Sequence, residues 1–230
     1  MIKEKFHALH LAVAHAGTPQ IRNTATLGGN LAQRTRCWYF RSIEHQCYRK
    51  GSGTCYAQEG ENEFHAIMKN ISCASVHSSS VSTALMAFNA KVQITSSNGK
   101  TKEIGMEEFF VHPEVNSKNE SVLGAKDLIT GIVIPPAKPG TKSYYIKQGA
   151  RESHDWAIAD VAVVTEMSGG KCKNVEIVLG AAAPVPMKAA EAARMLLGKS
   201  IDEAIAKSAG EASMKGATPL AGNAYKVPIF

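Results

Sequence analysis

The sequence lacks three features: a C-x-x-C pair, a run of apolar residues long enough to cross a membrane, and a Ser/His/Asp or paired-carboxylate arrangement. A membrane-spanning helix needs about 20 consecutive apolar residues, so we expect no membrane insertion. The start, MIKEKFHALHLAVAHAG, mixes charged residues and histidines into its apolar stretch, which disfavours a signal peptide. We therefore expect a soluble, cytoplasmic protein.

The composition is that of a folded protein with a basic charge balance. Its 230 residues are 44% hydrophobic, which is enough to bury one sizeable core or two small ones. The net charge of +6 could suggest a nucleic-acid partner, but the basic residues are scattered and not interleaved with aromatic residues, so we expect no nucleic acid. One local cluster of cations is formed by Arg34, Arg36, Arg41, Arg49 and Lys50.

Four of the five cysteines lie in or close to that cluster, namely Cys37, Cys47, Cys55 and Cys73. Their spacing is C-x9-C-x7-C-x17-C, in a segment with little hydrophobic periodicity. A long structureless connection inside a domain is unusual unless it binds something, so the spacing predicts a metal centre whose thiolate charge the cations offset. The pattern is compatible with iron–sulfur, with zinc and with free buried thiols. Cys172 is expected to be a core or surface thiol.

A glycine-rich turn precedes the first cysteine, in the stretch TPQIRNTATLGGNLAQRTRC. Gly28 and Gly29 can take backbone angles that other residues avoid, and Asn30 tolerates the left-handed conformation. Such a turn exposes consecutive N–H groups that suit an anion such as a pyrophosphate. By itself, Gly-Gly-Asn is also an ordinary turn signal.

The longer string PQIRNTATLGGNLA resembles the pyrophosphate-binding loop of the FAD subunit of molybdenum hydroxylases, the family of xanthine dehydrogenase and CO dehydrogenase. The resemblance continues through HSSSVSTALMAFNAKVQI, DLITGIVIP, KQGARESHDWAIADVAVV and VLGAAAPVPMKAAEAARMLLG. It implies an α+β fold in two parts. Residues 1–136 would form a partial FAD-binding domain (PCMH or vanillyl-alcohol-oxidase-like) with an iron–sulfur insert at about residues 34–73, and residues 137–230 a CO-dehydrogenase-flavoprotein-like C-terminal α+β domain.

The string TRCWYF and its position resemble the 4-hydroxybenzoyl-CoA reductase branch, whose insert ligates a [4Fe-4S] cluster. The resemblance implies such a cluster on Cys37, Cys47, Cys55 and Cys73, although the last spacing is longer than this branch would lead us to expect. It also implies FAD contacts from Thr26, Leu27, Gly28, Gly29, Asn30, Ser80, Lys147, Arg151 and Trp156, with Asp155 a further candidate beside the flavin ring. Trp156 could equally be a plain core residue and Arg151 a surface ion-pair member.

The resemblance implies an electron-transfer flavin and iron–sulfur subunit of a molybdenum hydroxylase-like oxidoreductase complex, of the aryl-CoA reductase or dehydrogenase type. Its implied partners are a large molybdopterin subunit and a small [2Fe-2S] subunit. The family's preceding α/β unit, with a second FAD loop, has no counterpart here, so we expect this chain alone to hold little FAD and a separate polypeptide to supply the rest. Two alternatives are an assembly module that has lost FAD and a zinc-stapled basic protein that binds nucleic acid.

Apolar periodicity and turn residues predict the secondary structure. Helices are expected at residues 4–16, 187–197 and 202–214, with another starting near serines 78–80. Strands are expected at residues 91–95, 127–135, 144–148, 159–166 and 173–181. The segment PPAKPGTK is the candidate domain boundary, and helices should cover one face of an antiparallel sheet.

Overall fold

The computed structural model describes all residues from 1 to 230. The helices are α1 (Ile2–Lys5), α2 (His7–Ala14), α3 (Pro19–Thr24), α4 (Leu27–Leu31), α5 (Trp38–Arg41), α6 (Ser80–Ala87), α7 (Met106–Phe109), α8 (Ala190–Leu196) and α9 (Glu203–Ser213), with 3-10 helices η1 (Tyr48–Lys50), η2 (Tyr56–Gln58) and η3 (Ala224–Ile229). The strands are β1 (Lys91–Ser96), β2 (Thr101–Gly105), β3 (Asp127–Val133), β4 (Thr141–Gln148), β5 (Ala159–Ser168), β6 (Lys171–Gly180) and β7 (Met187–Lys188). No helix has the length and apolar character that a membrane span requires.

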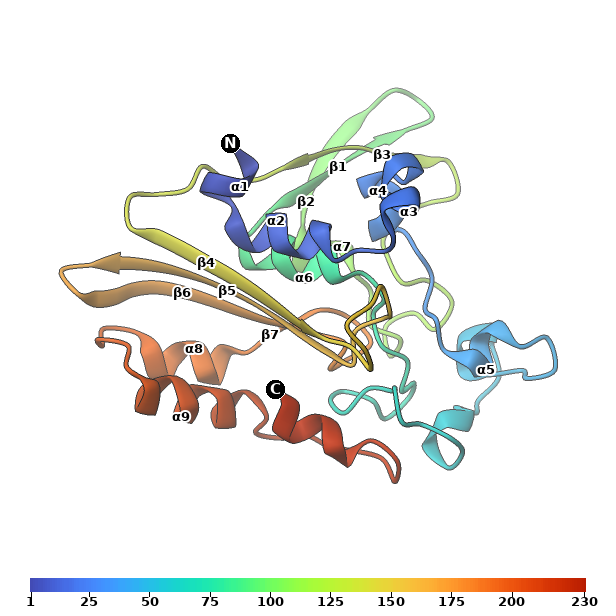
Figure 1. The fold of residues 1–230 in the computed structure, drawn as a ribbon. Coiled ribbons are helices and arrows are strands. Elements are labelled where there is room, and N and C mark those ends of the chain that lie inside the picture. Colours follow the sequence, from blue (N-terminus) through green and yellow to red (C-terminus); the bar gives the residue numbers. More distant parts are fainter.

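Two antiparallel sheets organise the chain (Figure 1). The first has three strands in the order β2-β1-β3, and the second has four in the order β4-β5-β6-β7. A tight turn at Gly169 and Gly170 joins β5 to β6, and both glycines have a positive φ (56° and 75°) that other residues rarely adopt. All five predicted strands are present, which confirms the alternating patterns from which they were expected.

Helices cover both faces of the four-stranded sheet (Figure 1). On one face α2 and α6 share a core with Tyr145, Ala162 and Val178. On the other face α8 and α9 pack against Ile177 and Leu179. Successive residues of a strand point to opposite faces, so β6 is buried on both. The two C-terminal helices therefore lie on one face, as expected for the C-terminal α+β part, and α2 and α6 from the N-terminal half cover the other face.

The predicted helices are mostly confirmed, with differences at their ends. The N-terminal helix is divided at Phe6, whose φ and ψ (−133° and 57°) leave the helical region. The predicted helix at residues 187–197 begins only at Ala190, because Met187–Lys188 pairs with β6 as a strand. Helix α9 starts as expected, since Asp202 accepts a hydrogen bond from the Ile205 N–H (2.8 Å).

Residues 37–73, called the cysteine segment below, contain only α5, η1 and η2 and lie beside the C-terminal tail. Figure 1 shows α5 and the loops next to it at one end of the molecule, whereas Ile67 and Met68 pack in the core on β6. The buried Lys226 Nζ donates to the carbonyls of His65 (2.9 Å) and Ala181 (2.8 Å), and Asn223 Nδ2 donates to His65 O (3.1 Å). The tail therefore fixes the second half of the segment, so order there does not depend on a metal alone.

Candidate functional site

A cleft of about 530 Å³, called the polar cleft below, lies between the α2–α4 region, the start of α6 and the loop that follows β4. Six of the nine residues predicted to contact FAD line it: Thr26, Gly29, Asn30, Ser80, Lys147 and Trp156. These residues come from three separate stretches of the sequence. The fold thus brings together, around one cavity, the segments that the resemblance singled out.

The glycine-rich stretch forms the helical turn α4 rather than an irregular turn. Thr26 caps it, because its Oγ1 accepts a hydrogen bond from the Gly29 N–H (3.0 Å). Neither Gly28 nor Gly29 has a positive φ, so the expectation that they supply unusual backbone angles is wrong. A Cβ atom on Gly29 would meet only Thr26 Oγ1 (3.1 Å). The remaining space around Gly29 is open to a ligand.

Three predicted residues lie outside the polar cleft, and two of them, Leu27 and Gly28, belong to α4. A Cβ atom on Gly28 would lie 3.2 Å from the Cβ of Ile129, so this glycine allows α4 to pack closely on β3. Leu27 is 40% exposed and does not line the cleft either. The N–H groups of Leu27 and Gly28 form no hydrogen bond within the chain, because they begin a helical turn.

Asn30 is held in place by the start of α6. Its Oδ1 accepts a hydrogen bond from Ser79 Oγ (2.5 Å), and Ser79 in turn caps α6 by accepting from the Ser82 N–H (3.1 Å). The Nδ2 group of Asn30 has no partner within the chain. It is therefore a free donor on the wall of the polar cleft, next to the half-buried Ser80.

Lys147 supplies the cationic wall of the polar cleft. Its Nζ donates to the carbonyls of His15 (2.9 Å) and Asp155 (3.1 Å), which fixes the position of the ammonium group. Burial lowers the pKa of Lys147, and the carboxylates of Asp160 and Asp155 offset part of that effect. A fixed cation suits an anionic ligand or an electron-rich ring.

A second cavity of about 530 Å³, the aromatic cleft, adjoins the first. Its apolar lining includes Trp38, Phe64, Trp156 and Ile158. Arg36, Asp155 and Trp156 line both clefts, and the Arg36 guanidinium lies 4.7 Å from the centre of the Trp156 ring. Cys37 also lines the aromatic cleft, which therefore leads from Trp156 to the first predicted cluster ligand.

Arg151 lines the aromatic cleft and not the polar one. Its Nε donates to Asp155 Oδ2 (3.1 Å), and its side chain is 77% exposed. This hydrogen bond lowers the pKa of Asp155, with a smaller contribution from one to Ser153. Arg151 is thus a surface ion-pair member that also reaches the mouth of the cleft.

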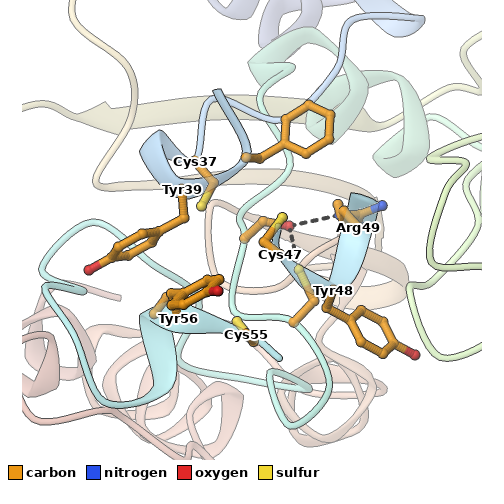
Figure 2. A pocket seen from close by; sticks show the side chains of 11 residues that line it. Cys37, Tyr39, Cys47, Tyr48, Arg49, Cys55 and Tyr56 are labelled. Atoms are coloured by element: carbon orange, nitrogen blue, oxygen red, sulfur yellow. Dashed lines mark hydrogen bonds between the residues drawn. The ribbon is translucent and has the colours of Figure 1, made fainter. Parts of the chain in front are cut away.

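The four predicted ligands Cys37, Cys47, Cys55 and Cys73 line one small cavity, the four-thiol cavity (Figure 2). Cys47 and Cys73 are buried, Cys37 and Cys55 are half-buried, and none forms a disulfide. Tyr39, Tyr48 and Tyr56 are among the other residues that line it. Four cysteines widely spaced in the sequence therefore converge, as the spacing predicted.

Arg49 is the only cation on the wall of this cavity. Its Nε donates to Ser75 Oγ (3.2 Å), and Ser75 Oγ lies 3.2 Å from Cys73 Sγ; Figure 2 draws both hydrogen bonds as dashed lines. Glu120 faces the guanidinium from outside, with its Oε1 3.8 Å from Arg49 Nη1, and pairs more closely with Arg34 Nε (2.6 Å). A positive charge thus lies against four thiols.

The sequence reasoning did not identify Ser75, Glu120 or His65 as site residues. His65 Nε2 lies 3.2 Å from Cys37 Sγ, and burial, with a smaller contribution from the charge of Lys226, lowers the pKa of His65 to about 4. The position of Ser75, two residues after Cys73, was a usable signal. Glu120 offered none, since its contact with Arg49 spans a long stretch of the sequence.

The thiols differ in how easily they ionise. Burial raises the pKa of Cys37 to about 11, and the backbone N–H groups of Phe40 and Tyr39 offset only part of that rise. A hydrogen bond with Cys55 lowers the pKa of Cys73 against the opposing effect of burial, and the charge of Arg49 lowers it further. The charge of Arg49 therefore favours the thiolate form of Cys73.

Four thiols are a ligand set for a [4Fe-4S] cluster and for a zinc centre alike. As the side chains stand, no three His, Cys, Asp or Glu groups are arranged to hold a metal ion. The buried Arg49 would offset part of the negative charge of either centre. The cavity encloses only about 10 Å³, so the side chains would have to move apart to accept a cluster.

Comparison with known families covers both halves of the chain. Residues 1–137 match the FAD binding domain in molybdopterin dehydrogenase, and residues 144–227 match the CO dehydrogenase flavoprotein C-terminal domain. The chain belongs to the FAD-binding medium subunits of the molybdenum hydroxylase family. The family and the fold class expected from the resemblance are thereby confirmed.

Individual relatives agree with this membership. The chain is 30% identical to the aldehyde oxidoreductase FAD-binding subunit PaoB of Escherichia coli, over 98% of this chain and 68% of that protein. It is 26% identical to the nicotine 6-hydroxylase medium subunit of Paenarthrobacter nicotinovorans, over 87% of this chain and 53% of that protein. A carbon monoxide dehydrogenase structure from Hydrogenophaga pseudoflava shares the fold, with a TM-score of 0.70 and 22% identity over 99% of this chain and 64% of that one. The chain thus spans roughly half to two thirds of the length of these relatives.

Proposed function

We propose that this chain passes electrons between FAD and a [4Fe-4S] cluster within an oxidoreductase complex, as a subunit that does not itself bind the organic substrate. The aryl-CoA reductase and aldehyde oxidoreductase types are the proposed classes of complex. The observation that carries the proposal is the continuity of the three cavities. The polar and aromatic clefts share Arg36 and Trp156, and Cys37 lines both the aromatic cleft and the four-thiol cavity.

In this proposal the polar cleft holds the FAD diphosphate. The N–H groups at the start of α4 and the Asn30 Nδ2 group are unpaired donors suited to phosphate oxygens. Ser80 donates to the sugar-like chain of FAD, and Lys147 and Trp156 contact its ring, with Arg151 at the rim. When bound, FAD supplies electron exchange with a carrier, and the fixed Lys147 ammonium favours the reduced, anionic ring.

The cysteine segment holds the cluster in the same proposal. The ligands are Cys37, Cys47, Cys55 and Cys73, and Arg49 offsets their charge. Tyr39, Tyr48 and Tyr56 line the cavity around the sulfur atoms. When bound, a [4Fe-4S] cluster would supply one-electron transfer, and Cys37 and Trp156 line the same aromatic cleft.

The proposed partners are a large molybdopterin subunit and a small [2Fe-2S] subunit. Support comes from the relatives, which are named as FAD-binding or medium subunits. We also propose that protein outside these 230 residues, in the same or a separate polypeptide, completes the FAD site. Without that additional protein, FAD would lack several charge-assisted hydrogen bonds of roughly 1.5–3 kcal/mol each, so its binding to the 230 residues would be weaker by orders of magnitude. Calorimetric titration of the 230 residues with FAD should then show weak binding, and submicromolar affinity would contradict it.

The decisive experiment replaces Gly29 by Val in the native complex. A branched side chain at Gly29, where a Cβ would meet only Thr26 Oγ1 (3.1 Å), would occupy the space of the diphosphate, so we expect the flavin to be released while the iron content stays unchanged. The control is Gly105→Val, at a strand glycine where a Cβ would meet no atom within 4 Å. Flavin absorbance and iron content per protein are the measurements. Full flavin content in Gly29→Val would mean that α4 has only a structural role.

A further inference from the structure

Arg49 is a buried cation whose charge is only partly matched. It is 3% exposed, and its Nη1 atom forms no hydrogen bond. The nearest carboxylate oxygen, Glu120 Oε1, lies 3.8 Å from Nη1, beyond hydrogen-bond length. Glu120 is shared with Arg34, whose Nε is much closer (2.6 Å). Burying a cation with so little compensation is costly, so we expect another negative charge nearby.

A short hydrogen-bonded chain connects Arg49 to a cysteine sulfur. Arg49 Nε can only donate, so Ser75 Oγ accepts that hydrogen bond (3.2 Å). The Ser75 hydroxyl hydrogen is then free to be donated toward Cys73 Sγ, which lies 3.2 Å away. A thiolate at Cys73 would accept it. Arg49 therefore orients the Ser75 hydroxyl toward the inside of the four-thiol cavity.

We propose that Arg49 and Ser75 are positioning residues that raise the reduction potential of an iron–sulfur cluster held by the four cysteines, and that Glu120 limits this rise. The inference rests on the proposed function. Reduction adds one electron, and so one negative charge, to the four-thiol cavity without forming or breaking a bond. Nearby positive charge and hydrogen bonds to sulfur favour that form, while a carboxylate disfavours it. In the complex the electron comes from reduced flavin or a one-electron carrier protein.

Shifts of opposite sign in the midpoint potential of the cluster distinguish this role from a purely structural one. Ser75→Ala removes the hydrogen bond to sulfur, so the midpoint potential should become more negative. Arg49→Lys keeps the charge but loses the planar group that orients Ser75, so it should shift the potential in the same direction. Glu120→Gln removes the opposing charge and should make the potential more positive. If Arg49 and Glu120 mattered only for folding, both variants would lower iron content and leave the potential of the remaining cluster unchanged.

The experiment is an anaerobic redox titration of the intact complex, with dithionite as reductant, followed by electron paramagnetic resonance. We expect Ser75→Ala to change the one-electron equilibrium by about tenfold, which is about 59 mV. The control is Ser72→Ala, whose side chain points away from the cavity toward Glu114 (3.4 Å). Ser75→Ala and Glu120→Gln proteins with full iron and the wild-type potential would overturn this proposal alone. A wild-type complex without iron would overturn it together with the proposed function.

Discussion

The four-stranded sheet and the cysteine segment are ordered by different means. β5 and β6 are 10 residues long each, pair their backbone groups in a ladder and lie between two apolar cores. The cysteine segment has no helix longer than four residues. Short turns and side chains satisfy its carbonyl groups instead of a ladder: for example, Asn62 Nδ2 donates to Ala57 O and Asn70 Nδ2 to Ala66 O (2.9 Å each).

This difference determines how each region should respond to substitution. Many dispersed apolar contacts hold the sheet, so the loss of one polar group there should have limited effects. In the cysteine segment single polar or sulfur atoms each hold several residues of irregular backbone. The comparison therefore predicts that the largest effects follow from changes in or around the cysteine segment.

The largest effect is expected from Cys55→Ser, which removes one of the four proposed ligands. Iron content and broad visible absorbance should fall to background, because metal binding supplies part of the folding energy of the segment. Limited proteolysis should then cleave within residues 42–56, while residues 62–70 stay protected by the C-terminal tail. Cys47→Ser should behave alike.

The control for this change is Cys172→Ala, at a buried cysteine of β6 in the core shared with α8. This variant should keep the wild-type iron content. Iron analysis and mass spectrometry of the fragments are the measurements. Stoichiometric zinc with negligible iron in the anaerobically purified wild type would refute the cluster, and unchanged iron in Cys55→Ser would remove that cysteine from the ligand set.

The next largest effect is expected at Lys226, whose ammonium group connects His65 of the cysteine segment to Ala181, directly after β6. This connection is called the clamp below. Lys226→Met should lower the free energy of unfolding by about 1–3 kcal/mol, because two buried carbonyls lose charge-assisted hydrogen bonds. Burial already lowers the pKa of Lys226 to about 8, with Asp160 opposing, so removing the charge recovers part of the loss. Urea unfolding gives the difference, and Lys207→Met on the exposed face of α9 is the control. Equal shifts in both variants would show that the clamp contributes nothing.

The same contrast explains what could be predicted from the sequence. The strands were predictable because their pattern is local, and so was the cap of α9 by Asp202. The convergence of four cysteines followed from spacing and resemblance, without any periodicity. The packing of Gly28 on Ile129 and the contact of Glu120 with Arg49 depend on segments that meet only in the folded chain. Neither the composition nor the spacing of residues predicts such contacts.

A pH-dependent effect is expected within the sheet, at the buried Asp160. Burial raises the pKa of Asp160 to about 7, against the opposing effects of the Thr83 and Tyr145 hydroxyls. The unfolded carboxyl ionises near 3.8, so the folded state binds more protons between about pH 4 and 7. Stability should therefore fall as pH rises through this window, by at most about 1.4 kcal/mol per pH unit.

Asp160→Asn has no proton to lose and should abolish this slope. Urea unfolding at several pH values between 4 and 8 measures it for both proteins. The exposed Glu61→Gln variant is the control and should keep the wild-type slope. A slope that persists in Asp160→Asn would assign the pH dependence to another group, such as one in the cysteine segment.

The smallest effect is expected from Arg151→Gln, in the loop between the sheet and the aromatic cleft. The ion pair with Asp155 is solvent-exposed on the arginine side, and exposed pairs contribute little to stability, so the unfolding midpoint should not move. Flavin affinity in the complex should fall by less than about tenfold, because water competes with a cation at the cleft rim. Arg194→Gln, which breaks the exposed pair with Glu191 on α8, is the control for stability. Flavin loss as complete as in Gly29→Val would make Arg151 a principal FAD contact, and a midpoint shift beyond that of Arg194→Gln would make its ion pair structural.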